Sequence, residues 1–171
     1  KGTKIVVTRP ADRSGSLTGK LRSLGAEVID YPCIRTVPRD PAVELELAIG
    51  RLQEYKCLVF TSPAGPQVFF DRLRALGKDA RALWGLTVAA IGPKTAQALK
   101  KHGITPDIVP EVYDSDHLAK ALEHITGPVL LCRASKGSSA VPDLLTGKGI
   151  AFDDVPCYDT VYASPDPEKV L

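Results

Sequence analysis

Short apolar runs alternate with helical patterns of hydrophobic residues along the whole chain. The runs that predict strands are Ile5–Val7, Ala26–Ile34, Cys57–Phe60, Thr87–Ile91, Asp107–Val109, Val129–Cys132 and Phe152–Cys157. The segments with helical spacing are Leu17–Leu24, Val43–Leu52, Pro66–Leu76, Lys94–Lys101, Asp116–Ile125 and Val141–Leu145. Strands that alternate with helices over short connections predict an α/β fold with a mostly parallel sheet.

The chain also contains a widely spaced internal repeat. A displacement of 124 positions aligns residues 1–37 with residues 125–161 without a gap and gives nine identities. The identical pairs are Arg9 and Arg133, Ser14 and Ser138, Leu21 and Leu145, Gly25 and Gly149, Asp30 and Asp154, Pro32 and Pro156, Cys33 and Cys157, Thr36 and Thr160, and Val37 and Val161. We interpret the repeat as two copies of one βαβ unit, although any two such units share a glycine and some leucines.

If the two copies belong to two similar domains, one domain is inserted in the other. We then expect residues 1–37 to be the N-terminal part of a first α/β domain with a linker strand. Residues 38–159 would be a complete second domain, and residues 160–171 the return linker and the start of the remainder of the first. The first domain would need roughly 80 further residues. The two linker segments are expected to pair as an antiparallel ladder.

Composition narrows the classes of function. The chain has 171 residues, of which 44% are hydrophobic and 25% charged, and this is typical of a globular protein with a sizeable core. No apolar run has the length of a membrane span. With no such run we expect no membrane partner, and because 22 basic and 20 acidic residues leave a net charge of only +2, we expect no nucleic acid as partner.

The cysteines indicate the cellular compartment, and the first residue indicates whether the chain is part of a longer polypeptide. The four cysteines form no CxxC pair and lie in apolar runs, which favours a reducing, cytoplasmic environment. The chain starts at Lys1, contains no methionine and shows no targeting segment. We therefore interpret it as a piece of a longer polypeptide.

Small hydroxyl residues follow several of the predicted strands. They lie in the segments Thr8-Arg9-Pro10, Thr61-Ser62-Pro63, Gly92-Pro93-Lys94-Thr95, Tyr113-Asp114-Ser115 and Arg133-Ala134-Ser135. Open parallel sheets bind ligands at the carboxyl ends of their strands, where helix N-termini present unpaired N–H groups. We therefore expect an edge that accepts anions, although each segment alone is also what a helix cap requires.

Standard motifs for cofactors and metals are absent from the sequence. It contains no GxGxxG after a strand, no Walker motif, no GxSxG and no HExxH. His117 and His124 lie seven residues apart on one expected helix, but surface histidines show this spacing far more often than metal ligands do. We expect no metal and no cofactor.

A set of short motifs carries a specific resemblance. Val-Thr-Arg-Pro at 7–10, Leu-x-x-Leu-Gly-Ala-Glu-Val at 21–28, Val-Phe-Thr-Ser-Pro at 59–63, Ala-Ile-Gly-Pro-Lys-Thr-Ala at 90–96 and Cys-Tyr-Asp-Thr at 157–160 occur in this order. With Pro32 before an extended segment, the set resembles the uroporphyrinogen-III synthase family over the whole chain.

The resemblance implies both a fold and an activity. The fold is two flavodoxin-like parallel-sheet domains, the second inserted in the first and joined to it by a two-stranded linker, with the first domain incomplete in this chain. The activity is the dehydrating cyclisation of hydroxymethylbilane, with inversion of ring D, to uroporphyrinogen III. We expect a cytoplasmic bacterial monomer without a cofactor. The start at Lys1 fits a covalent fusion to a preceding methyltransferase domain, and equally a trimmed chain.

The resemblance and the hydroxyl-rich edge together nominate the site residues. Tyr158 matches a tyrosine near the domain crossing and is the candidate general acid, with aromatic packing of the linker as the alternative. The candidate substrate-binding residues are Thr8, Arg9, Thr61, Ser62, Thr95, Ser115 and Arg133. Two positions depart from relatives that carry arginine, namely Ala64 and the segment Ser138-Ser139-Ala140.

Two other functions stay open at this point. A non-catalytic flavodoxin-like module could bind a phosphate or a tetrapyrrole on the same edge. A flavin or nucleotide protein of similar topology is disfavoured, because the sequence has no glycine-rich phosphate loop.

Overall fold

The computed structural model describes residues 2–163, apart from the side chains of residues 11–13. These residues divide into two compact units. One unit contains residues 2–37 and 160–163, and the other contains Pro38–Asp159.

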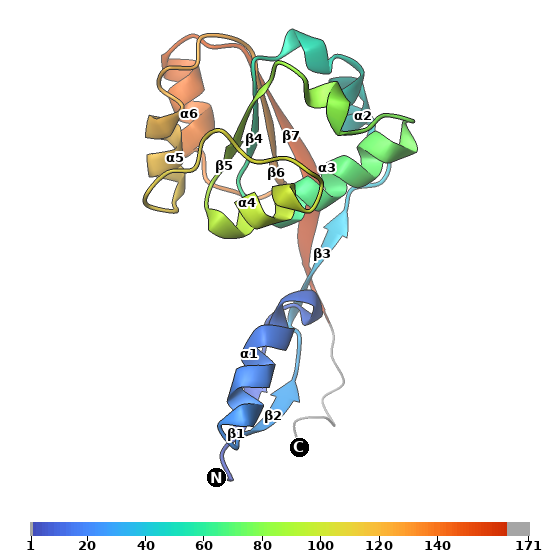
Figure 1. Ribbon diagram of the computed structural model, residues 1–171, viewed down its shortest axis with the longest axis vertical. Coiled ribbons are helices and arrows are strands. Elements are labelled where there is room, and N and C mark those ends of the chain that lie inside the picture. Colours follow the sequence, from blue (N-terminus) through green and yellow to red (C-terminus); the bar gives the residue numbers. More distant parts are fainter. Residues whose placement is uncertain (1, 164–171) are drawn as a thin grey trace. The chain divides into compact units, whose positions relative to one another are not determined.

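The smaller unit is a single βαβ motif (Figure 1). Strands β1 (Lys4–Val7) and β2 (Glu27–Asp30) pair in parallel, and helix α1 (Ala11–Ser23) connects them. The Thr18 hydroxyl donates a hydrogen bond of 2.9 Å to the Asp30 carboxylate and so ties α1 to β2. Much apolar surface stays uncovered, since Leu24 is 79% exposed. Two strands and one helix bury little core by themselves.

The larger unit is built on a parallel sheet. Strands β4 (Cys57–Phe60), β5 (Thr87–Ala90), β6 (Val129–Ala134) and β7 (Phe152–Tyr162) follow the spatial order β7-β6-β4-β5. The pairs β4–β5, β4–β6 and β6–β7 are all parallel. Strand β3 (Ile34–Pro38) lies beside β7 and completes a five-stranded sheet.

The pairing of β3 with β7 is antiparallel. The Ala163 N–H donates to the Cys33 carbonyl, and the Arg39 N–H donates to the Cys157 carbonyl. Residue numbers therefore rise along one strand as they fall along the other, which is the antiparallel pattern.

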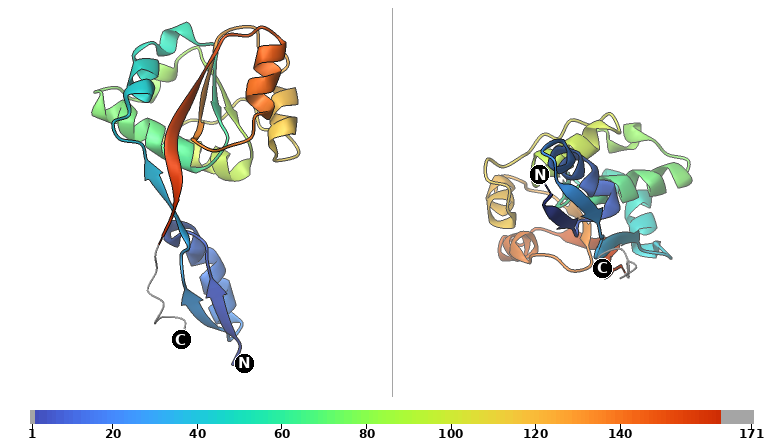
Figure 2. Two further views of the ribbon diagram at one scale, coloured as in Figure 1. Left: turned by 180° about the vertical axis from the view of Figure 1, so that it is seen from behind. Right: turned by 90° about the horizontal axis from the view of Figure 1, so that it is seen from below.

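Helices cover both faces of the parallel sheet (Figure 2). Helices α2 (Val43–Gly50), α3 (Ala64–Ala75) and α4 (Pro93–Lys100) pack on one face, and α5 (Ser115–Ala121) and α6 (Ala140–Gly147) on the other. Short 3-10 helices η1 (Leu52–Glu54) and η2 (Ala80–Leu83) precede β4 and β5. The unit is thus a three-layer α/β arrangement.

Strand β4 shows how completely the central strands are buried. All four of its residues are 0% exposed, with Leu58 and Phe60 facing α2–α4 and Cys57 and Val59 facing α5 and α6. Burial raises the pKa of the Cys57 thiol to about 12, with a smaller contribution from the Asp107 carboxylate. Strands buried on both faces read as continuous apolar runs, and this explains the pattern in the sequence.

The α/β class and the parallel sheet expected from the sequence are confirmed, but two predicted strands differ. The segment Asp107–Val109 forms only an isolated bridge, Ile108 to Ala89, because prolines flank it and the Asp107 carboxylate itself accepts the Val88 N–H. The predicted strand Ala26–Ile34 is interrupted after Asp30, close to Pro32, which lacks an N–H. Within residues 2–163, no helix combines the length and the apolar character that a membrane crossing requires.

We predict that His102 makes the stability of the larger unit depend on pH. Its ring stacks on buried Phe70 at 4.4 Å between centroids, and partial burial lowers its pKa, as do Arg74 and Lys101, against an opposing effect of Asp71. A histidine whose pKa is lower in the folded state costs stability when it is protonated. The urea midpoint should therefore fall as the pH drops below about 6.5, the ordinary histidine pKa.

The variant His102→Phe isolates this effect, since its ring can still stack on Phe70 but cannot take a proton. Its urea midpoint should change less between pH 7.5 and 5.5 than that of the unsubstituted chain. Equal changes in both proteins would show that His102 is not responsible.

Candidate active site

The carboxyl ends of the parallel strands bring the predicted site residues of the larger unit to one edge. Phe60, the last residue of β4, lies opposite Ala90 of β5 and Cys132 of β6. Ala134, the last residue of β6, lies opposite Tyr158 of β7. The segments at these strand ends carry Thr61, Ser62, Thr95 and Arg133.

Tyr158 occupies this edge through an irregularity in β7. Arg133 pairs with Pro156, but the next residue of β6, Ala134, pairs with Tyr158, so that Cys157 is an extra residue in β7. This is the pattern of a β-bulge, which bends a strand and re-aims its side chains. Tyr158 is only 5% exposed and packs with the core cluster on the face of α2–α4.

The Tyr158 hydroxyl lies 2.5 Å from Ser62 Oγ, and this contact joins β7 to the loop after β4. Ser62 Oγ in turn accepts a hydrogen bond of 3.4 Å from the Gly65 N–H, in the first turn of α3. A Cβ at Gly65 would meet the Phe60 ring at 3.0 Å and the Cys132 carbonyl at 3.3 Å. Glycine therefore lets α3 start close against the sheet.

Thr95 and Ser115 lie in the first turns of α4 and α5. Thr95 is 1% exposed, so its side chain is packed inside the edge rather than displayed on it. Ser115 is half-buried, and the cap of α5 is Asp114, whose carboxylate accepts from the His117 N–H at 2.8 Å and contacts the His117 ring. These hydrogen bonds lower the pKa of Asp114.

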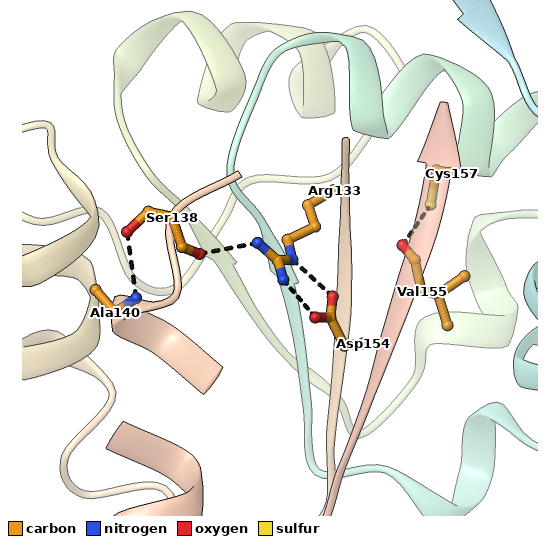
Figure 3. A network of polar contacts seen from close by, with 6 residues as sticks. All are labelled: Arg133, Ser138, Ala140, Asp154, Val155 and Cys157. Atoms are coloured by element: carbon orange, nitrogen blue, oxygen red, sulfur yellow. Dashed lines mark hydrogen bonds and ion pairs between the residues drawn. The ribbon is translucent and has the colours of Figure 1, made fainter. Parts of the chain in front are cut away.

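Arg133 is engaged by the protein itself (Figure 3). Its Nε donates to Asp154 Oδ1 at 2.6 Å, its Nη2 contacts the other carboxylate oxygen, and its Nη1 donates to the Ser138 carbonyl at 2.8 Å. The hydrogen bonds to Asp154 raise the pKa of the guanidinium. In this geometry Arg133 fastens β6 to β7 and to the loop before α6.

Thr8 and Arg9 belong to the smaller unit. Both are exposed and follow β1, whose last residue Val7 lies opposite Asp30 at the end of β2. The structure therefore brings Thr61, Ser62, Thr95, Arg133 and Tyr158 to one edge of one unit, while Thr8 and Arg9 lie at the corresponding edge of the other.

Two contributors at this edge were not predicted. Asp154 is one of two adjacent aspartates near the start of β7, and its match with Asp30 in the internal repeat was the signal in the sequence. Asp159 accepts from the Ser135 hydroxyl and lies 3.8 Å from the Arg39 guanidinium, a link that no sequence motif indicates. Across residues 2–163, no group of three or more histidine, cysteine, aspartate or glutamate side chains is arranged to hold a metal ion.

Comparison with known proteins shows the family to which the chain belongs. The model of the family "Uroporphyrinogen-III synthase HemD" matches residues 15–171. The chain belongs to the uroporphyrinogen-III synthase family. The resemblance seen in the sequence motifs is thereby confirmed.

Relatives with curated names agree with the family. The chain is 42% identical over 172 residues to the "Porphyrin biosynthesis protein HemD" of Ruminiclostridium josui and 28% identical over 179 residues to the "Uroporphyrinogen-III synthase" of Synechococcus elongatus. Each alignment covers 99% of this chain, but only 34% and 65% of the respective relative. The chain thus spans about a third of one relative in the uroporphyrinogen-III synthase family and just under two thirds of the other.

A solved structure shows the same fold. The uroporphyrinogen III synthase of Thermus thermophilus, in a mutant form, superposes with a TM-score of 0.73 at 23% identity. The match covers 99% of this chain and 66% of the Thermus chain. The α/β fold with its five-stranded sheet is therefore that of uroporphyrinogen-III synthase structures.

We predict that the Arg133–Asp154 pair stabilises this edge. The two side chains are only 15% and 31% exposed, so Asp154→Asn would leave a half-buried guanidinium without its counter-charge. The free energy of unfolding should fall by about 1–3 kcal/mol. Urea denaturation measures this change directly.

The matched control is Asp79→Asn, at an ion pair with Arg81 whose side chains are 54% and 91% exposed. An exposed pair contributes little, and asparagine still caps the following turn, so stability should change far less than in Asp154→Asn. Equal losses in both variants would contradict the role given to Asp154.

Proposed function

We propose that this chain carries out the uroporphyrinogen-III synthase reaction as part of its natural polypeptide. The reaction converts hydroxymethylbilane to uroporphyrinogen III and water, with inversion of ring D. The observation that carries the proposal is the family match over residues 15–171. The position of Tyr158 beside Ser62, at the carboxyl edge of the sheet, agrees with it.

The architecture that goes with this function is two flavodoxin-like domains, the second inserted in the first. Residues 1–37 would begin the first domain, residues 38–159 would form the second, and residues 160–171 would return to the first. The compact units of the structure and the exposed apolar residues of the smaller unit support this division. An incomplete first domain would leave Leu24 to be covered by the remainder of its own sheet and helices.

The chemistry asks for little beyond a proton donor and conformational restraint. An electron-rich pyrrole expels the hydroxyl once the leaving oxygen receives a proton, and Tyr158 is the candidate donor. The carbon–oxygen bond breaks, water leaves, and the resulting azafulvene forms a carbon–carbon bond to the substituted carbon of ring D. The bond from that carbon to its original methylene bridge then breaks, the bridge rejoins ring D at its free α-carbon, and the proton on that carbon is lost. The enzyme must hold the chain so that the substituted carbon attacks.

The substrate's acetate and propionate groups would be met at the hydroxyl-rich edge. In the second domain the candidates for direct contact are Thr61, close to the N-terminus of α3, which favours anions, and the half-buried Ser115. Thr95 is 1% exposed and the Ser62 hydroxyl contacts Tyr158, so we propose no direct contact of these two with the substrate. From the first domain the candidates are Thr8 and Arg9. The Asp154 carboxylate and the Ser138 carbonyl already accept hydrogen bonds from Arg133. A substrate carboxylate could therefore be bound only by the N–H groups of the Arg133 guanidinium that these two partners do not use.

The family also suggests the cofactor requirement, the cellular location, the oligomeric state and the partners of this enzyme. We infer that the enzyme needs no cofactor, acts in the cytoplasm as a monomer, and binds neither nucleic acid nor membrane. A covalent fusion to a methyltransferase domain is compatible with the length of the Ruminiclostridium josui relative, of which this chain covers 34%.

The deciding experiment gives hydroxymethylbilane to the natural polypeptide that contains this chain and separates the uroporphyrinogen isomers. We predict the type III isomer. Formation of the type I isomer alone, at the spontaneous rate, would reject the synthase in favour of a non-catalytic module that binds tetrapyrrole or phosphate.

Tyr158→Phe tests the role of the hydroxyl. General acid catalysis contributes roughly 10²- to 10⁴-fold, so kcat should fall by a factor in that range while the unfolding free energy changes little. An unchanged kcat would leave Tyr158 as an aromatic packing residue of the linker.

A further inference from the structure

We propose that Ser62 is a positioning residue for Tyr158, and that the bulge at Cys157 exists to bring the two hydroxyls together. The proposal rests on the function proposed above and assigns to Ser62 a role different from direct substrate binding. It follows from the alternation of side chains in β7 and from the hydrogen bonds of the Ser62 hydroxyl.

Strict alternation would place Tyr158 on the wrong face. In β7, Asp154 lies on the face of α5 and α6, where it meets Arg133, and Val155 lies in the core cluster on the face of α2–α4. Successive residues of a regular strand point to opposite faces, so Tyr158 would share the face of Asp154. Instead both Cys157 and Tyr158 belong to the cluster on the α2–α4 face.

The bulge supplies this change of direction. Pro156 still pairs with Arg133, and Tyr158 pairs with the next residue of β6, Ala134. One extra residue, Cys157, therefore shifts the alternation by one step from that point onward. As a result Tyr158 lies on the face of α2–α4, and its hydroxyl lies 2.5 Å from Ser62 Oγ in the loop between β4 and α3.

The hydrogen bonds around Ser62 give its hydroxyl a direction. The Gly65 N–H donates to Ser62 Oγ and occupies one of its lone pairs. A tyrosine that gives its proton to a leaving group must keep its own O–H for the substrate, so Ser62 must donate to the Tyr158 oxygen. This donation would stabilise the negative charge that develops on the phenol oxygen during proton transfer.

The N-terminus of α3 would also stabilise the negative charge that develops on the Tyr158 oxygen. α3 is 12 residues long, and its first-turn N–H at Gly65 faces the Ser62 oxygen. The positive end of the helix dipole thereby acts on Tyr158 through one intervening hydroxyl. Ser62 would link this partial charge to the reacting group without touching the substrate.

Kinetics of single and double variants test the proposal. Ser62→Ala should lower kcat roughly 10- to 100-fold, the usual effect of losing a hydrogen bond to a developing charge, with KM changed less than about twofold. Ser62→Thr, which keeps a hydroxyl, should restore most of kcat. In a Tyr158→Phe background, Ser62→Ala should cause no further loss, because the two residues act as one unit.

Other results would overturn the assignment. A raised KM with unchanged kcat, or a full Ser62→Ala effect that persists in Tyr158→Phe, would mean that Ser62 binds the substrate directly. If Ser62→Ala does not fold, Ser62→Cys offers a group of similar size with a weak donor and should also lower kcat. Ser62→Cys with the full rate would contradict the proposal.

A spectroscopic test does not depend on turnover. The chain has five tyrosines, and with the ring Cζ carbons labelled with carbon-13, Tyr158→Phe identifies the signal of Tyr158. Ser62→Ala should shift that signal. The control Ser23→Ala, which removes a hydroxyl that donates to the Lys20 carbonyl within α1, should not.

The proposed function and the role of Ser62 can be rejected separately. If the unsubstituted protein makes no type III isomer but Ser62→Ala still shifts the Tyr158 signal, the proposed function is wrong and the contact is real. If the protein is active and Ser62→Ala changes neither the signal nor kcat, only the role of Ser62 is wrong.

Discussion

Burial of β4 and β6 on both faces is the constraint from which the rest of the larger unit follows. Their side chains are almost wholly apolar and lie between two layers of helices, so neither face can hold a polar site without a large desolvation cost. Polar chemistry is left with the ends of the strands. At the carboxyl end, the helix starts after β4, β5 and β6 present N–H groups, and the chain supplies small hydroxyls and glycines there. The polar side chains therefore gather at the carboxyl ends of the strands, because the buried faces of the sheet cannot hold them.

The same constraint explains which features could be predicted from the sequence. Runs such as Cys57–Phe60 predict buried parallel strands because no other element tolerates such continuous apolarity over so few residues. The hydroxyls at the strand ends, and hence most of the candidate site, follow from the same pattern. The family motifs add Tyr158, which periodicity alone does not distinguish from any other strand residue.

The features that could not be predicted from the sequence depend on the register in which β6 pairs with β7. The bulge at Cys157 needs the pairing of β6 with β7, and nothing in the segment Phe152–Tyr162 marks one residue as extra. The contact of Ser62 with Tyr158 joins residues that are 96 positions apart and depends on that bulge. The predicted strand Asp107–Val109 is a different case, because the flanking Pro106 and Pro110, which lack an N–H, were visible in the sequence and argued against a full strand.

Comparison of the two βαβ copies distinguishes residues that the shared fold requires from residues found in only one copy. Asp30 and Asp154 are equivalent in the two copies, and each fastens a strand to its neighbours, Asp30 through Thr18 and Arg22 and Asp154 through Arg133. A polar residue that recurs in both copies is thus explained by the shared fold. Tyr158 has no such counterpart, since the equivalent position holds Ile34, which is 36% exposed. The Tyr158 hydroxyl is therefore not a requirement of the shared βαβ fold, and this agrees with the role proposed for it in the second copy.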